Sequence, residues 1–375
     1  MPPAAKEFVN FLSSVEKSRV SLRCSRSSAW FRGVRSYKYD LRPALFRELA
    51  PHAAPLNDAK VVDELYVSTN LPWLSHDNRS EVVTLADEIR ARQITIASLK
   101  KKKRDIERLL RDHNIKVYGR EDASKYDFEK LRLQEILVGI KDLISNNNDA
   151  ITDVLVKLNT IASCVTGEYD AYIDFTFRSG EKDLSSWVLL AKMQHFKIPT
   201  RLLDWTESFF VALFFAVELY IDVLISEDYD QFLDIQQKWF DHLEEPKIFI
   251  MNPYFLARVS TGKNSLLNPS VENSHDYFES FFETKHWPYR KPVPIYSPWK
   301  DDRIASQRGM FTVHGHDIRS LEEIVGSDVV GQVKLSRKCS IAAAWILKDY
   351  ALYNRYSLFR DLDTLGAFEK ARFLS

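Results

Sequence analysis

Four polar side chains stand in apolar surroundings and could do chemistry together. Arg201 and Asp204 lie three residues apart in a short polar segment that leads into a strongly apolar run. Arg32 lies in an apolar stretch near the start of the chain, and Gln307 stands at the entrance to another. Two guanidinium groups, a carboxylate and an amide can together hold a ligand that carries a diphosphate.

Each of these residues also has a structural interpretation. Arg32 could pair with Asp204 or Asp40 as an ion pair in the core. Arg201 and Asp204 could satisfy each other and cap the following helix, and Gln307 could bond backbone groups as a buried amide. The sequence leaves both interpretations open.

The residues around this polar segment predict the elements that position it. A helix over Ser185–Met193 should end before Pro199, because proline cannot continue a helix. Thr200 to Trp205 is then a short strand or tight turn, and the run from Phe209 to Ile225 is apolar nearly all round. A helix of that kind is buried, so the polar segment that precedes it must lie at or near the core.

The motifs resemble the FRG domain, a bacterial family named for a Phe-Arg-Gly triplet near its start. Four blocks carry the resemblance, and they follow one another in the family's order. They are Trp30 to Gly33, Gln194 to Ala216, Arg303 to Thr312, and Ser357 to Asp363.

The resemblance implies an α+β core and a role as an effector in bacterial antiviral defence or toxin-like systems. The Trp-Phe-Arg-Gly strand is also similar to the first strand of ADP-ribosyltransferases, where an Arg-Gly or His-Gly pair grips NAD. We therefore expect an NAD-dependent ADP-ribosyltransferase-like enzyme in which NAD is the substrate. The expected catalytic residues are Arg32, Asp204 and Gln307, and the expected NAD-binding residues are Arg32, Gly33, Arg201 and His195.

The chain departs from the transferase pattern on its late strand. That strand offers Gln307-Arg308-Gly309 where those enzymes have Glu-x-Glu, so the carboxylate must come from Asp204, Glu207 or Glu218. The alternative is a non-catalytic module that binds a nucleotide or nucleic acid, or that regulates a partner. The acceptor would be nucleic acid or protein.

Composition changes between two parts of the chain. We predict an FRG core formed by residues 1–58 and 166–375, interrupted by a helical insertion over 59–165. The insertion should form a hairpin or small bundle of helices at Glu81–Asp112, Asp127–Ile144 and Ala150–Cys164. The insertion carries the basic run Lys100–Arg104, which is either a solvated face or a contact for nucleic acid. It could also receive a regulatory partner.

The remaining elements mix helices and strands without a regular β-α-β rhythm, so we expect the α+β class with a single mixed sheet. Ile173–Phe177 is a short strand or a helix start. Strands are expected at Lys247–Met251, Met310–His314 and Val329–Leu335. Ser260–Lys300 is expected to be a long loop with a short helix at Tyr277–Glu283.

Composition and charge give no support for a polyanion partner, a disulfide framework, a membrane span or a metal site. Lys plus Arg equals Asp plus Glu at 52 each, so net charge gives no support for a polyanion partner. Three scattered cysteines predict free thiols in a reducing cytoplasm. Glu218 and Asp222 interrupt the apolar run, which favours a buried helix over a membrane span. Three histidines, His195, His314 and His316, lack metal-ligand spacing, so we expect no metal.

Overall fold

The computed structural model describes residues 3–25, 28–48, 76–117, 123–181, 183–226, 237–269, 276–283, 287–298, 301–315, 317–351 and 353–374. The chain divides into two compact units. Met1–Glu48 and Glu168–Ser375 form the first, which we call the core unit, and Leu49–Gly167 form the second, the hairpin unit. The predicted boundary after residue 58 lies outside the described residues.

A six-stranded sheet organises the described part of the core unit, in the order β4-β5-β2-β1-β3-β6. The strands are β1 (Trp30–Val34), β2 (Leu202–Thr206), β3 (Lys247–Met251), β4 (Val293–Ile295), β5 (Gly309–Val313) and β6 (Val330–Lys334). The predicted α+β class is confirmed. We expected a mixed sheet, but all five strand pairs are antiparallel; the parallel contact Leu267–Ile295 is an isolated bridge.

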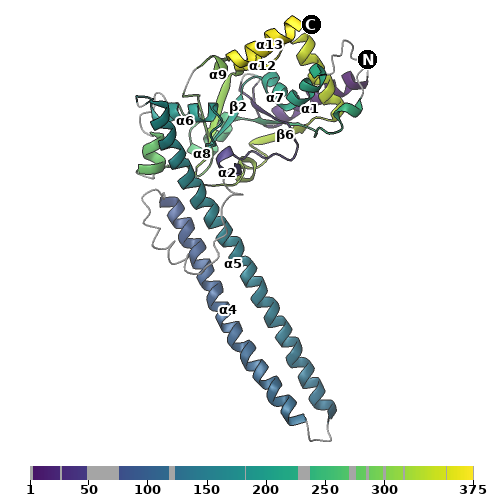
Figure 1. Ribbon diagram of the computed structural model, residues 1–375, viewed down its shortest axis with the longest axis vertical. Coiled ribbons are helices and arrows are strands. Elements are labelled where there is room, and N and C mark those ends of the chain that lie inside the picture. Colours follow the sequence, from purple (N-terminus) through teal and green to yellow (C-terminus); the bar gives the residue numbers. More distant parts are fainter. Residues whose placement is uncertain are drawn as a thin grey trace. The chain divides into compact units, whose positions relative to one another are not determined.

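Helices cover this sheet and link its strands (Figure 1). They are α1 (Pro3–Ser21), α2 (Ala44–Glu48), α6 (Ser186–His195), α7 (Phe209–Ser226), η3 (Gln237–Phe240), α8 (Pro253–Thr261), η4 (Glu279–Glu283), α9 (Asp302–Gln307), α10 (Leu321–Val325), α11 (Arg337–Trp345), η5 (Ile346–Tyr350), α12 (Arg355–Phe359) and α13 (Leu362–Leu374). The segment Ser260–Lys300 contains η4, where a short helix was predicted, and also β4, which was not predicted.

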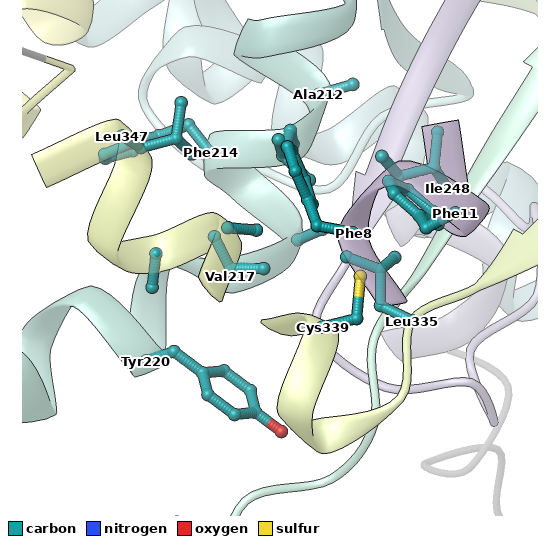
Figure 2. Close-up of a cluster of buried hydrophobic side chains, with 14 of the residues drawn as sticks. Phe8, Phe11, Ala212, Phe214, Val217, Tyr220, Ile248, Leu335, Cys339 and Leu347 are labelled. Carbon is teal, nitrogen blue, oxygen red and sulfur yellow. The ribbon is translucent and has the colours of Figure 1, made fainter. Parts of the chain in front are cut away.

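Helix α7 is buried as predicted, and it lies directly on β1. An added Cβ on Gly33 would lie 1.8 Å from the carbonyl oxygen of Ala212, so the helix backbone fills the space where a side chain would be. Phe8 of α1, Phe214 and Val217 of α7 and Cys339 of α11 belong to the same buried cluster (Figure 2). The close approach of α7 to the sheet therefore depends on a residue without a side chain.

The two faces of the sheet bury different sets of side chains. Successive strand residues point to opposite faces, and Phe31 joins the cluster around α7 whereas Trp30 joins a second cluster with Trp205 and Phe249. A third cluster gathers aromatic side chains, including Trp187 of α6, Tyr277, and Phe281 of η4. The sheet is thus covered on both faces, and few of its side chains reach solvent.

Two long helices, α4 (His76–Val117) and α5 (Ala123–Ser179), run in opposite directions (Figure 1). Buried residues recur along them at multiples of seven, at Ile89 and Ile96 in α4 and at Ile140 and Val154 in α5. This spacing is typical of two helices that pack along one seam.

The predicted helices Asp127–Ile144 and Ala150–Cys164 form one continuous helix, so the predicted break at Ser145–Asn148 is wrong. Ile173–Phe177 also belongs to this helix. Asn147 donates to the carbonyl of Leu143 at 2.8 Å, within its own helix. This side chain is satisfied inside the helix, and the burial of Ile140 and Val154 on either side outweighs the weak helix preference of asparagine.

Cys24, Cys164 and Cys339 are buried and form no disulfide, as expected. Among the described residues, no helix is long and apolar enough to cross a membrane. The apolar run that raised this question forms α7, whose side chains pack in the core unit.

Replacing Gly33 with alanine should strongly destabilise the protein. The new methyl group would overlap the backbone of α7, so we expect a loss of ~3 kcal/mol or more in the free energy of unfolding. Urea denaturation measures this loss. Gly139→Ala is the matched control, because nothing lies within 4 Å of its added Cβ; in mid-helix it should stabilise by ~0.5–1 kcal/mol. Equal stability of Gly33→Ala and the wild type would contradict the packing of α7 on β1.

Two phenylalanines of α7 should respond differently to truncation. Phe214 is 1% exposed, and its replacement with alanine should cost ~3–5 kcal/mol because a cavity remains in the core. Phe210 is 46% exposed, and its replacement should cost less than ~1.5 kcal/mol. Thermal melting of the two variants compares them directly, and similar losses would show that the two faces of α7 are not buried as described.

Candidate functional site

Asp204 is the exposed residue of an otherwise buried strand. The other four residues of β2 are buried, whereas the Asp204 side chain is 54% exposed. Gln194 at the end of α6 donates from Nε2 to Oδ2 of Asp204 at 2.9 Å, and its Oε1 accepts from Thr200 at 2.5 Å. Because Thr200 fixes the orientation of the Gln194 amide, the carboxylate is held in place while it still faces solvent.

Arg32 binds the backbone of Asp204. Its Nη1 donates to the carbonyl oxygen of Asp204 at 2.6 Å and lies 3.5 Å from the carboxylate oxygen Oδ2. Strands β1 and β2 pair at Phe31–Thr206, and the guanidinium of Arg32 joins the two strands next to this pair. Burial lowers the pKa of Arg32, and the attraction of Asp204 partly offsets this effect. Of the two predicted partners of Arg32, the structure has Asp204; Asp40 pairs with Arg42.

A second set of polar side chains lies beside Asp204. His195 Nδ1 is 3.4 Å from Asp301 Oδ2, and Arg303 Nη1 is 3.5 Å from the carbonyl oxygen of His195. Burial lowers the pKa of Arg303, whereas the negative charges of Asp204, Asp301 and Asp361 raise it. Burial and the nearby Arg303 lower the pKa of His195, so its imidazole is neutral at pH 7. We call Arg32, Gln194, His195, Asp204, Asp301 and Arg303 the Asp204 cluster.

Sequence reasoning missed three members of this cluster. Arg303 lies inside a block that resembles the family, but its own block gives no sign that it faces Asp204. Asp301 has the position of a helix cap, and its Oδ1 does accept from the backbone of Ile304 at 2.7 Å. Gln194 was visible in the sequence as the residue before His195.

Arg201 is buried and fully engaged, which favours a structural role over NAD binding. Its partner is Glu168, not Asp204 as the structural interpretation supposed. Its Nε donates to Glu168 Oε1 at 2.7 Å, and its Nη1 donates to the carbonyl of Gly315 at 2.7 Å. The guanidinium also lies 3.8 Å from the ring centre of Phe281. With 3% of the side chain exposed, no donor faces a ligand.

Tyr277 completes the environment of Glu168. Its hydroxyl donates to Glu168 Oε1 at 2.6 Å. Burial, with the negative charge of Glu168, raises the pKa of Tyr277 well above its usual range, so the phenol keeps its proton. The buried carboxylate thus has a cation and a neutral donor, which is the condition under which a buried charge is tolerated.

Gly33 and Gln307 also make structural contacts. The space beside Gly33 is filled by the backbone of α7, so no ligand can approach there. Gln307 Nε2 donates to the carbonyl of Leu358 at 3.1 Å, as the structural interpretation supposed. No hydrogen bond in the described part of the chain joins the Gln307 side chain to Arg32 or Asp204.

Asp204 is also the most suitable of the three candidate carboxylates. Glu218 is buried between Arg35 and Arg355, and both arginines bind its carboxylate. Glu207 is exposed, and within the described residues no hydrogen bond fixes its side chain. A catalytic carboxylate has to be both accessible and oriented, and Asp204 meets both conditions.

Metal-ligating side chains do not gather in the described residues: no group of three or more His, Cys, Asp or Glu side chains could hold an ion there. His195 belongs to the Asp204 cluster, and His314 is buried next to Phe46, with ring centres 6.1 Å apart. His316 lies outside the described residues.

Comparison with known protein families found a match to one family model, which covers part of the chain. The model of the FRG domain matches residues 169–222, which include α6, β2 and most of α7. The match therefore covers Gln194, His195 and Asp204 of the cluster. No curated protein and no solved structure matches the chain.

The buried His314 should make the protein sensitive to acid. Burial, with nearby Arg201, lowers the pKa of His314 from 6.5 to about 3, and neither ring nitrogen has a hydrogen-bond partner. The unfolded chain takes up a proton below pH 6.5, whereas the folded protein does not until about pH 3. Stability conferred by the neutral ring is therefore present above pH 6.5 and is lost as the pH falls, by up to ~1.4 kcal/mol per unit.

His314→Phe keeps a planar ring without the titrating group, so the variant should lose less stability between pH 6.5 and pH 4 than the wild type. Urea denaturation at several pH values measures this difference. His242→Gln removes an exposed histidine and should leave the acid dependence unchanged. Identical pH dependence of His314→Phe and the wild type would show that His314 does not carry the effect.

Proposed function

We propose that this chain, which contains an FRG domain, is an NAD-dependent ADP-ribosyltransferase-like enzyme and the effector of a bacterial defence or toxin-like system. The observation that supports the proposal is that the carboxylate of Asp204 is both exposed and held in one orientation. Its carboxylate is exposed, yet Gln194 holds it from one side and Arg32 anchors its backbone from the other. An oriented, accessible carboxylate beside a cationic side chain is what cleavage of NAD requires of a protein.

Asp204 would act on the ribose of the substrate. As the bond from the ribose C1′ to the nicotinamide nitrogen breaks, its electron pair leaves with nicotinamide and positive charge develops on the ribose. A carboxylate facing that carbon stabilises the charge. Water or an acceptor nucleophile on protein or nucleic acid then forms the new bond to C1′ and gives up its proton to Asp204 or to solvent.

Arg303 and His195 would contact the rest of the ligand. Arg303 lies near three carboxylates and carries a planar fork of donors that suits a diphosphate. The neutral imidazole of His195 can accept or donate a hydrogen bond to a ribose hydroxyl. Neither residue is a catalytic group in this proposal.

Arg32 and Gln194 are positioning residues. Nη1 of Arg32 donates a hydrogen bond to the backbone carbonyl of Asp204, so the main contribution of Arg32 is to place that residue and its carboxylate. Gln194 sets the carboxylate's orientation through the bond to Oδ2. Arg201, Gly33 and Gln307, which the sequence also nominated, support the fold around the site.

Nicotinamide release from NAD tests the proposal with the full chain. Asp204→Asn keeps the size of the side chain and should lower release by ~10²–10³-fold, because the charge that stabilises the ribose is lost. Thermal melting of this variant should stay near that of the wild type, because the carboxylate is solvent-exposed. Asp363→Asn, an exposed change in α13, is the matched control and should keep full activity.

Growth of bacteria that express the chain gives a second readout. The wild type should deplete cellular NAD and arrest growth, and Asp204→Asn should do neither. Glu207→Gln separates the two exposed carboxylates near the start of α7. Loss of activity in Glu207→Gln but not in Asp204→Asn, or no nicotinamide released by the wild type in vitro and in cells, would refute the role of Asp204.

A further inference from the structure

Helix α4 carries a cluster of basic side chains that the proposed chemistry does not use. Between Arg90 and Arg111 the helix has nine Lys or Arg residues and two acidic ones, although the whole chain has no net charge. Seven of the nine are exposed. Four of these seven are Lys101, Arg104, Arg108 and Arg111. They follow one another at three, four and three residues, so they lie on one face of the helix. We call these four the basic face of α4.

The basic face points away from the seam of the hairpin. The seam side of α4 contains Ile89 and Ile96, which are buried, and Lys103, which is half-buried and lies 3.8 Å from Glu107. Within the described residues, none of the four side chains of the basic face has a carboxylate within 4.0 Å. Their charges are therefore available to a partner.

The geometry fits a regularly spaced row of negative charges. At a rise of ~1.5 Å per residue, Lys101 and Arg111 lie ~15 Å apart along the helix axis. Successive phosphates of one strand of a B-form duplex are ~3.4 Å apart along its axis, so such a row spans about four phosphates.

The amino-acid composition of α4 indicates which class of partner its basic face would bind. The helix contains no Phe, Tyr or Trp, and recognition of unpaired bases depends on aromatic side chains that stack against them. Two large apolar side chains of the described part of α4, Ile94 and Leu109, are exposed, but they lie 15 residues apart. They form no continuous apolar face of the kind that anchors a helix in a lipid surface. Paired nucleic acid offers phosphates and requires no stacking.

We propose that the basic face of α4 binds the phosphate backbone of double-stranded nucleic acid without reading its sequence. This activity is separate from the Asp204 cluster, which lies in the core unit. It gives the FRG-domain chain a means to associate with duplex DNA or RNA.

Fluorescence anisotropy with a labelled 30-base-pair duplex tests the proposal. The probes are duplex DNA, duplex RNA and a single strand of the same length, each added to the full chain over a range of salt concentrations. The wild type should bind a duplex more tightly than the single strand, and its affinity should fall steeply with salt. Each phosphate contact contributes about −0.9 to the slope of log K against log salt.

The test variant replaces all four residues of the basic face with glutamine, which has a helix preference close to that of Lys and Arg. We expect at least a ~10-fold loss of duplex affinity and a salt slope shallower by ~3–4. Circular dichroism should show unchanged helix content. The control neutralises four exposed residues of the core unit, so net charge changes equally; they are Arg258, Lys263, Arg290 and Lys338.

The control variant should bind the duplex as the wild type does. Equal weakening in both variants would show an effect of net charge and would overturn the assignment to α4. Unchanged affinity in the basic-face variant would overturn it as well. So would wild-type binding to vesicles containing anionic lipid without binding to either duplex, because the partner would then be a membrane surface.

Discussion

The approach of one helix to one strand governs the core unit. Helix α7 lies so close to β1 that its backbone occupies the side-chain space of Gly33. This contact buries the apolar face of α7 between the sheet and helices α1 and α11, and it fixes where β2, which precedes α7, can run. Interiors packed at this density transmit the constraint, because neither backbone can yield without opening a void. The polar segment before α7 is therefore held rigidly.

A buried ion pair fixes the other end of that segment. Arg201, at the entrance to β2, is bound to Glu168 of α5 and to the backbone of Gly315. The carboxylate of Glu168 also accepts a hydrogen bond from Tyr277. Desolvation of such a pair is costly, and it is tolerated here because its donors and acceptors are matched. Its contribution is to place β2 uniquely, so that Asp204, three residues later, reaches solvent at a defined position.

The two charged residues of the segment thus have different roles: Arg201 is buried and structural, and Asp204 is exposed and oriented. Arg32 joins the same arrangement through the Asp204 backbone. The position of the basic face of α4 has a different origin. It is set by the spacing of the residues along one helix, and it depends on no tertiary contact. Chemistry and polyanion binding are accordingly proposed for different units of the chain.

The sequence alone determined the buried helix α7, the strand β3, the α+β class and the polar segment between α6 and α7. These follow from local periodicity and from Pro199, which any fold of the chain must obey. Only the tertiary structure decided that Arg201 pairs with Glu168, that the backbone of α7 packs against Gly33, and that Arg303 lies near Asp204. The partners in each case are distant in sequence, and hydrophobic spacing does not specify which polar groups meet when the sheet forms. The continuous α5 was missed for the opposite reason: polar residues suggest a break locally, but packing along the seam keeps the helix intact.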